Sequence, residues 1–223
     1  MIIVPVYNEE PAILRRTLKA LRGAGARILV VDDGSHPAVE VAVSPDVILL
    51  RHSVNLGQGA ALETGMAFAR KDQFVDILVH FDADGQHFPS DIANLLAPLF
   101  KGEADIVFGS RFMRQADRLR IPPMRRLILQ LGRIFNRVVT SIQMTDAHIG
   151  LRALNRRAFE RISLRENRMA YATELLWQVH KHELRWHEVP VAVVYTPYSR
   201  AKGQSSWNAF TIVGDIFLRI IYR

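Results

Sequence analysis

The chain has 223 residues, which is enough for one sizeable hydrophobic core but short for two full domains. Its hydrophobic content of 49%, its charged content of 23% and its lack of cysteine exclude a disordered chain, disulfides and a cysteine-ligated zinc site. The net charge of +7 is unevenly placed, because the stretch between Arg111 and Arg168 is rich in arginine. This stretch should either attract phosphate groups or form a solubilising face.

Apolar runs rich in β-branched residues alternate with helical patterns through the first half of the chain. The apolar runs predict five buried strands, over residues 2–6, 27–31, 47–51, 77–81 and 105–109. Apolar residues at helical spacing predict helices over 11–21, 59–69 and 89–100. This alternation predicts an α/β fold, in which helices cover both faces of a mostly parallel sheet.

The second half carries different patterns and no linker, so we expect one domain over residues 1–223. The sequence predicts a basic amphipathic helix, a second helix, a strand broken by Pro190, a polar loop and an apolar amphipathic helix. Their ranges are 125–140, 170–182, 187–195, 198–206 and 207–222. The last helix suits packing on the sheet, and its Trp207 and Tyr222 would also suit a membrane interface.

Neither a signal peptide nor a membrane span is expected. The chain opens directly with Met1-Ile2-Ile3, without a basic region or cleavage site, and no apolar run reaches the roughly 20 residues of a membrane span. We therefore expect a cytoplasmic protein.

Polar or glycine-rich residues follow each of the five predicted strands. Because ligands of parallel sheets bind beyond the carboxyl ends of the strands, we expect these residues to form one composite site. The five segments are Tyr7 to Glu9, Asp32 to Ser35, Asn55 to Gly59, Asp82 to His87 and Gly109 to Arg111.

Two carboxylates separated by one residue follow the fourth strand. Asp82 and Asp84 leave the sheet just before Gly85, and Gln86 can add an amide oxygen. Hard cations such as Mg²⁺ or Mn²⁺ prefer oxygen ligands of this kind, and a bound cation would neutralise a diphosphate leaving group. The alternative is a turn in which Asp84 serves as a local cap.

Acidic and aromatic residues after the first two strands suit a nucleoside. Asp32 and Asp33 could accept hydrogen bonds from a nucleobase or a ribose, or could simply form a tight turn. Tyr7 could flank a base and Glu9 could bind its polar edge. Asn8 could instead cap the following helix.

The glycine-rich segment 55–61 fails the dinucleotide-binding pattern, because Leu62 stands at the third glycine position. Glycines at a helix start, such as Gly57, can still lie close to phosphate oxygens.

Further along the chain, Arg111 and Arg152 could bind phosphates through two hydrogen bonds each. Asp146 and His148 could act as acid–base or orienting groups, although a lone residue of either type is more often structural.

Taken together, these segments resemble family 2 glycosyltransferases of the GT-A fold, and more narrowly the dolichyl- or polyprenyl-phosphate sugar synthases. The resemblance is close over about the first 155 residues. The matching segments, in order, are Val4 to Glu10, Val30 to Ser35, Asn55 to Gly59, Asp82 to His87, Gly109 to Arg111 and Asp146 to Arg152.

The resemblance implies a single GT-A domain, in which residues 1–112 bind a nucleotide sugar and residues 113–223 serve the acceptor. It implies a UDP-, GDP- or dTDP-sugar donor, Mg²⁺ or Mn²⁺, and inverting transfer to a polyprenyl phosphate. The implied base-lining residues are Pro5, Tyr7, Glu9 and Asp33, with further donor contacts from Asp32, Gly57, Asp82 and Ala83. The implied metal ligands are Asp82, Asp84 and Gln86, and the implied phosphate-binding residues are Arg111 and Arg126.

Two departures from the family pattern bear on the reaction. Gln58 stands where the family often has lysine, which leaves one charge fewer near the diphosphate. The acid pair of polysaccharide-forming relatives is not evident. Because a phosphomonoester with a second pKa near ~6 is largely a dianion at neutral pH, it can attack without a base. The sequence therefore favours a phosphate acceptor, and Glu174 as a base keeps a glycan hydroxyl open.

Other functions fit less well. A pI near 10.1 would suit a nonenzymatic phosphate- or nucleic-acid-binding module, but no aromatic-rich basic motif of an RNA-binding fold is present, so nucleic acid is not an expected partner. A sugar nucleotidyltransferase would need a glycine-rich, arginine-containing loop near its N-terminus, which is absent. Peripheral contact with a membrane, or with a membrane-protein partner, fits the expected acceptor.

Overall fold

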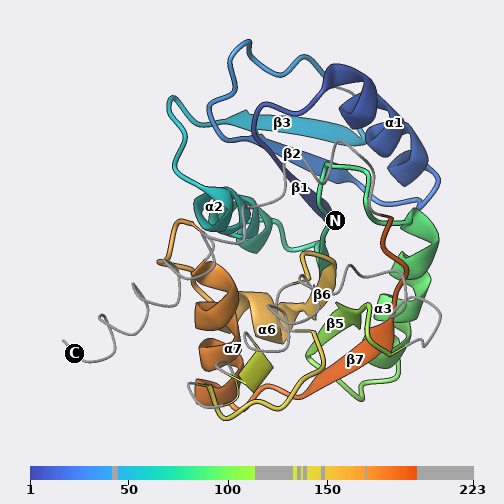
Figure 1. Cartoon of the computed structure of the whole chain (residues 1–223), viewed down its shortest axis with the longest axis vertical. Coiled ribbons are helices and arrows are strands. Elements are labelled where there is room, and N and C mark those ends of the chain that lie inside the picture. The colour runs from blue at the N-terminus through green and yellow to red at the C-terminus, as the bar shows by residue number, and fades with distance from the viewer. Residues whose placement is uncertain are drawn as a thin grey trace.

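The structure is a computed structural model that describes residues 1–41, 45–113, 133–134, 137, 140–146, 149–168 and 170–194 (Figure 1). One seven-stranded sheet runs through this part of the chain, in the order β3-β2-β1-β4-β6-β5-β7. The strands are β1 (Ile2–Val6), β2 (Ile28–Asp32), β3 (Val47–Arg51), β4 (Ile77–His80), β5 (Ile106–Ser110), β6 (Arg152–Asn155) and β7 (Trp186–Pro190).

The sheet is mostly parallel, as predicted. β1, β2, β3 and β4 pair in parallel, and so do β5 and β7. β6 lies antiparallel between β4 and β5 and was not predicted, because its four residues include Arg152 and Asn155 and give no apolar run. The strand predicted over 187–195 already ends at Pro190.

Helices cover both faces of the sheet. The cluster of buried side chains on one face comes from α2, α6 and α7, and the cluster on the other face from α1 and α3. The helical segments are α1 (Pro11–Arg22), α2 (Gln58–Arg70), η1 (Pro89–Asp91), α3 (Ile92–Phe100), α6 (Arg156–Arg161) and α7 (Tyr171–Lys181). The helix predicted over 89–100 begins as the 3₁₀ turn η1, and the short α6 was not predicted.

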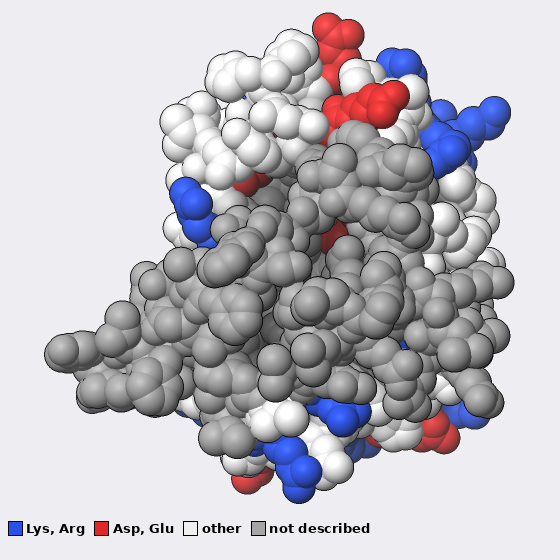
Figure 2. Space-filling view, viewed as in Figure 1, with Lys and Arg blue, Asp and Glu red and all other residues white. Residues whose placement is uncertain are grey.

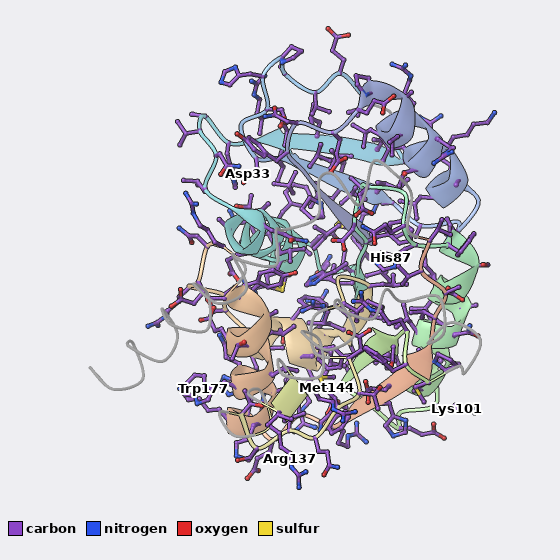
Figure 3. All side chains as sticks on the ribbon, in the orientation of Figure 1. Asp33, His87, Lys101, Arg137, Met144 and Trp177 are labelled. Atoms are coloured by element: carbon purple, nitrogen blue, oxygen red, sulfur yellow. The ribbon has the colours of Figure 1, made fainter. Side chains whose placement is uncertain are left out.

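The alternation of side chains along β1 explains these two layers. Ile3 faces the α2 side, whereas Ile2 and Val4 face the α1 side. Because helices cover both faces, successive residues of this strand can all be apolar. Small residues let α2 approach closely, because a Cβ on Gly65 would lie 2.6 Å from the side chain of Ile3. Figure 2 shows basic side chains gathered over α1, and Figure 3 shows Trp177, an exposed hydrophobic residue, on the outer side of α7.

Several predicted segments lie outside the described residues. These are most of the basic helix 125–140, the polar loop 198–206 and the amphipathic helix 207–222, so each of them stays a prediction. Within the described part of the chain, no helix has the length and apolar character needed to cross a membrane.

Candidate active site

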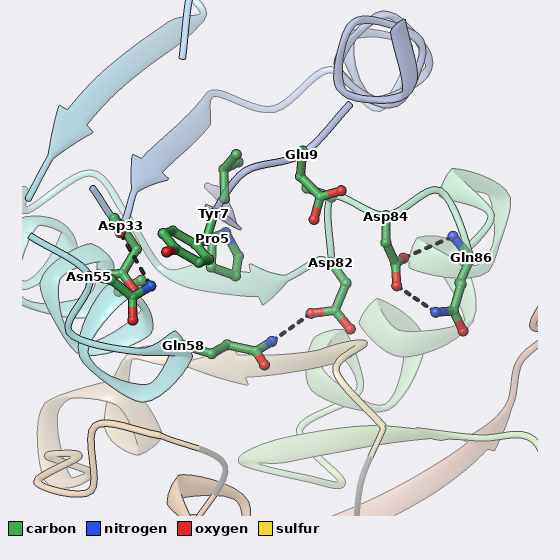
Figure 4. Close-up of a pocket in the computed structure, with 12 residues that line it drawn as sticks. Pro5, Tyr7, Glu9, Asp33, Asn55, Gln58, Asp82, Asp84 and Gln86 are labelled. Carbon is green, nitrogen blue, oxygen red and sulfur yellow. Dashed lines mark hydrogen bonds between the residues drawn. The ribbon is translucent and has the colours of Figure 1, made fainter. Parts of the chain in front are cut away.

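A pocket of about 280 Å³ opens at the carboxyl ends of the parallel strands (Figure 4). The segments after β1, β2, β3 and β4 all contribute to it, as the strand topology predicts. Its lining residues are Pro5, Val6, Tyr7, Glu9, Asp33, Asn55, Gln58, Ala61, Asp82, Ala83, Asp84 and Gln86. The fifth predicted segment, which ends at Arg111, does not line this pocket.

The loop after β4 presents Asp82, Asp84 and Gln86 to the pocket. Asp84 accepts a hydrogen bond from the backbone N–H of Gln86 at 3.0 Å and another from the side-chain amide of Gln86. Gly85 has a φ of 72°, a left-handed conformation that favours glycine. Asp84 therefore forms the predicted local turn and also lines the pocket, and its role as a metal ligand stays a prediction.

The two carboxylates differ in their surroundings. Burial, followed by the negative charge of Asp82, raises the pKa of Asp84. Burial would also raise the pKa of Asp82, but the hydrogen bond and charge of His87 and the charge of Arg152 outweigh it and lower that pKa. A divalent cation between the carboxylates would relieve their repulsion, and the oxygen donors present suit Mg²⁺ or Mn²⁺.

Asp82 is held from three sides. The side-chain amide of Gln58 donates to Oδ1 of Asp82 at 2.9 Å, and Nε2 of His87 lies 3.5 Å from Oδ2. The backbone of Gly150 packs directly against the carboxylate, so that any Cβ there would overlap it. The position of Asp82 thus depends on α2, on His87 in the loop after β4 and on the residues before β6.

Asp33 lines the opposite end of the pocket and organises the loop that follows β3. Its buried carboxylate accepts hydrogen bonds from the backbone N–H groups of Leu56 at 2.9 Å and Gly57 at 2.7 Å. It also binds the side chains of Asn55 and His52. Figure 4 shows Pro5 and Tyr7 between this loop and Glu9, where a flat ring could lie.

Comparison with known proteins identifies the family. The model of the family described as "Glycosyl transferase family 2" matches residues 1–163. The chain belongs to this family. It is 31% identical over 232 residues to the UDP-N-acetylglucosamine--dolichyl-phosphate N-acetylglucosaminyltransferase of Methanococcus voltae, covering 95% of this chain and 92% of the relative. It is 28% identical over 229 residues to the undecaprenyl-phosphate mannosyltransferase of Micrococcus luteus, covering 98% and 90%.

A solved structure supports the fold. The crystal structure of glucosyl-3-phosphoglycerate synthase from Mycobacterium tuberculosis, in complex with Mn²⁺, UDP and phosphoglyceric acid, superposes with a TM-score of 0.59 at 15% identity. The match covers 90% of this chain and 72% of the other. The predicted GT-A fold is therefore confirmed for this family 2 glycosyltransferase.

Asp32 does not take the place that the sequence predicted for it in the glycosyltransferase. It is completely buried, and its carboxylate accepts hydrogen bonds from the backbone of Ser35 at 2.9 Å and Val39 at 3.3 Å. We therefore assign Asp32 to support of the loop rather than to contact with a donor. Asn8 is also reassigned: it accepts a hydrogen bond from the backbone of His36 instead of capping α1.

The start of α2 is not open to a phosphate, contrary to the prediction from its glycines. The backbone N–H groups of Gly59 and Ala60 donate to the carbonyl oxygen of Asn167, at 2.8 and 3.3 Å. A Cβ on Gly57 or Gly59 would overlap the backbone of residues 166–167, so the glycines admit this segment of the protein. They serve packing, and Gly57 also donates to Asp33.

Two of the predicted site residues, Arg111 and Asp146, form an ion pair with each other. Nε of Arg111 lies 2.6 Å from Oδ2 of Asp146, and both side chains are buried. Thr145 and Asp146 donate their backbone N–H groups to the carboxylate of Glu188 on β7. Arg111 is therefore neutralised beside the end of β5, and Asp146 holds it there instead of facing the pocket.

Arg152 is 1% exposed and so does not reach a phosphate in the pocket, contrary to the prediction. Its guanidinium carbon lies 5.8 Å from the ring centre of Phe108 and 5.4 Å from that of Tyr171. Its partner on the adjacent strand β4 is His80. Burial and the charge of Arg152 lower the pKa of His80 to about 3. Sequence reasoning missed this buried cation near Asp82, because the pairing of Arg152 with His80 joins residues far apart in the chain.

Glu174, which the sequence offered as a possible base, is not among the residues that line this pocket. Its carboxylate accepts hydrogen bonds from the backbone N–H groups of Arg165 at 2.9 Å and Glu166 at 2.9 Å, and from the side chain of Gln178 at 3.3 Å. Glu174 thus anchors the segment before α7. Arg126 and His148 lie outside the described residues, so their roles stay predictions.

Proposed function

We propose that this glycosyltransferase moves a sugar from a nucleotide-diphosphate donor to a polyprenyl phosphate, with inversion at the anomeric carbon. The observation that carries the proposal is the pocket itself, which has a carboxylate pair at one end and an aromatic, polar wall at the other. Two relatives that align over nearly the whole chain are named for transfer to dolichyl or undecaprenyl phosphate, which supports the acceptor class.

Asp82, Asp84 and Gln86 would hold Mg²⁺ or Mn²⁺ against the donor diphosphate. Two carboxylates and an amide oxygen match the ligand preference of these cations. The metal would supply charge neutralisation of the leaving diphosphate. Gln58 and His87 would keep Asp82 in position for this role.

The other end of the pocket suits the nucleobase. Pro5 and Tyr7 offer apolar surface to a planar ring, and Glu9 can accept a hydrogen bond from its edge. Asp33 keeps this wall in shape through its contacts with residues 55–57. UDP is the nucleotide named for one relative and for the superposed structure, which supports a UDP-sugar as the first donor to test.

The acceptor needs no protein base under this proposal. A phosphomonoester dianion attacks the anomeric carbon through one of its oxygens, the bond from that carbon to the diphosphate breaks, and the electron pair leaves with the nucleoside diphosphate. Glu174, the base that a hydroxyl acceptor would require, is engaged by the backbone of residues 165–166. This geometry favours the phosphate acceptor over a glycan hydroxyl.

A polyprenyl phosphate lies in a membrane, so the proposal includes contact of the protein with the cytoplasmic membrane surface or with a membrane-protein partner. Such contact needs only a peripheral surface.

The test combines donor binding with transfer. UDP-, GDP- and dTDP-sugars are screened by thermal shift with and without Mn²⁺, since a ligand that binds the folded chain raises its melting temperature. The stabilising donor is then incubated with Mg²⁺ or Mn²⁺ and a short polyprenyl phosphate, and the glycolipid is measured by mass spectrometry. We expect one donor class to give product, and a chelator to stop the reaction. Absence of both stabilisation and product across the panel would overturn the proposal.

A further inference from the structure

The pocket carries an excess of negative charge over the described residues. Four of its lining residues are carboxylates, and none is lysine or arginine. Its ligands under the proposed function are also anionic. One divalent cation offsets two of these charges. A basic side chain at the mouth of the pocket would therefore further favour the binding of a phosphate. Arg111 and Arg152 do not supply it, because both are buried.

The segment 162–168 is fixed beside the pocket by contacts with two helices. The carboxylate of Glu63 on α2 accepts a hydrogen bond from the backbone N–H of Leu164 at 2.7 Å. Glu174 on α7 accepts from the next two backbone N–H groups. The carbonyl oxygen of Asn167 caps the start of α2, where Gln58 reaches Asp82. The backbone of this segment therefore has a defined place against the start of α2, the helix end that carries the pocket residue Gln58.

Arg168 is the basic residue at the end of this segment. Its Cγ would lie 3.0 Å from a Cβ on Gly57, so the stem of its side chain rests on the residue next to Gln58. The side chain is exposed, and within the described residues its guanidinium forms no ion pair. Three bonds beyond Cγ, the guanidinium can extend over the pocket mouth at the side where Gln58 contacts Asp82.

We infer that Arg168 is a phosphate-binding residue of this site, which contacts either the donor diphosphate or the phosphate of the acceptor. The inference rests on the proposed function, because that function places both phosphates at this mouth. A guanidinium can bind a phosphate through two parallel hydrogen bonds, which Gln58 cannot do. Arg168 would thus restore, from another part of the chain, the positive charge that Gln58 does not provide.

The test uses the full chain and the variants Arg168→Ala and Arg168→Lys, with Arg165→Ala as the matched control. Arg165 is an exposed arginine of the same segment, and its backbone rather than its side chain holds the segment to Glu174. Thermal unfolding first checks that each variant folds. Two affinities are then measured by calorimetry, one for UDP and GDP with Mn²⁺ and one for farnesyl phosphate as a short acceptor analogue.

We expect Arg168→Ala to weaken one of the two affinities by about tenfold or more, which is typical of a lost charge-assisted hydrogen bond. Arg168→Lys should recover part of the loss, and Arg165→Ala should change neither affinity. A loss for the nucleotides assigns Arg168 to the donor, and a loss for farnesyl phosphate assigns it to the acceptor. Wild-type affinities in Arg168→Ala would overturn the inference alone, whereas a wild-type chain that binds neither ligand would overturn the proposed function as well.

Discussion

At the scale of single residues, the neighbouring carboxylates Asp82 and Asp84 have different surroundings, and we expect them to have different roles. Asp82 is fixed by Gln58, His87 and the backbone of Gly150, and nearby positive charge keeps it ionised. Asp84 has a raised pKa, because burial and the charge of Asp82 both oppose its ionisation. A cation would stabilise the charged form of Asp84 most, so Asp84 should respond most strongly to metal.

Replacing Asp84 tests this directly. Asp84→Asn keeps the shape and the turn with Gln86 but removes the charge, so we expect kcat/KM for sugar transfer to fall by on the order of 100-fold or more. Asp76→Asn is the control, because that side chain is 85% exposed and lies at the other end of β4. The activities are compared at saturating Mn²⁺. Full activity in Asp84→Asn would exclude Asp84 as a metal ligand.

At the scale of elements, the segment 162–168 joins α2 to α7. Arg70 on α2 donates to the carbonyl oxygen of Phe159 at 2.8 Å and to Glu63, which in turn holds Leu164. Glu174 holds the other side of the segment. The segment also caps the start of α2, where Gln58 lines the pocket.

Glu174→Gln separates this anchoring role from catalysis by a base. The amide keeps one oxygen but loses the charge, so we expect the free energy of unfolding to fall by about 1–2 kcal/mol. We expect KM to rise, while kcat stays within a few-fold of the wild-type value and its pH profile keeps its shape. Denaturant unfolding and steady-state kinetics measure these effects. A loss of turnover with unchanged stability would instead indicate a base.

At the scale of the whole molecule, Asp105 links β5, β6 and β7 at the ends of these strands that lie opposite the pocket. It is 1% exposed, and it binds Arg185 before β7 and Asn155 at the end of β6. Burial opposes its ionisation, but the hydrogen bonds from Arg185 and Asn155 prevail and lower the pKa of Asp105 to about 2. The antiparallel strand β6 is thereby fixed between its neighbours.

This lowered pKa predicts how stability depends on pH. The ordinary pKa is 3.8, so the ionised Asp105 contributes its full stability above that value and loses it as pH falls toward 2. We expect Asp105→Asn to unfold more easily than the wild type at pH 6. The difference in free energy of unfolding should shrink between pH 4 and pH 2, as measured by urea titration. A difference independent of pH would contradict the assignment.

The sequence predicted the features that depend on neighbours along the chain. The five apolar runs became β1 to β5, and the polar residues expected after the first four strands line the pocket. The contacts that it missed join distant residues. Arg111 and Asp146 are 35 positions apart, so their pairing cannot be read from either motif. Glu174 likewise looked like a free acid because its backbone partners are not visible in a side-chain pattern.

Under the proposed function, the acceptor is a phosphate rather than a hydroxyl. The most direct measurement compares undecaprenyl phosphate with undecaprenol, which differ only in that group, under the same donor and Mn²⁺. Transfer of labelled sugar is followed to the lipid fraction. We expect product from undecaprenyl phosphate and none from undecaprenol. Comparable transfer to undecaprenol, or transfer to undecaprenol alone, would contradict it.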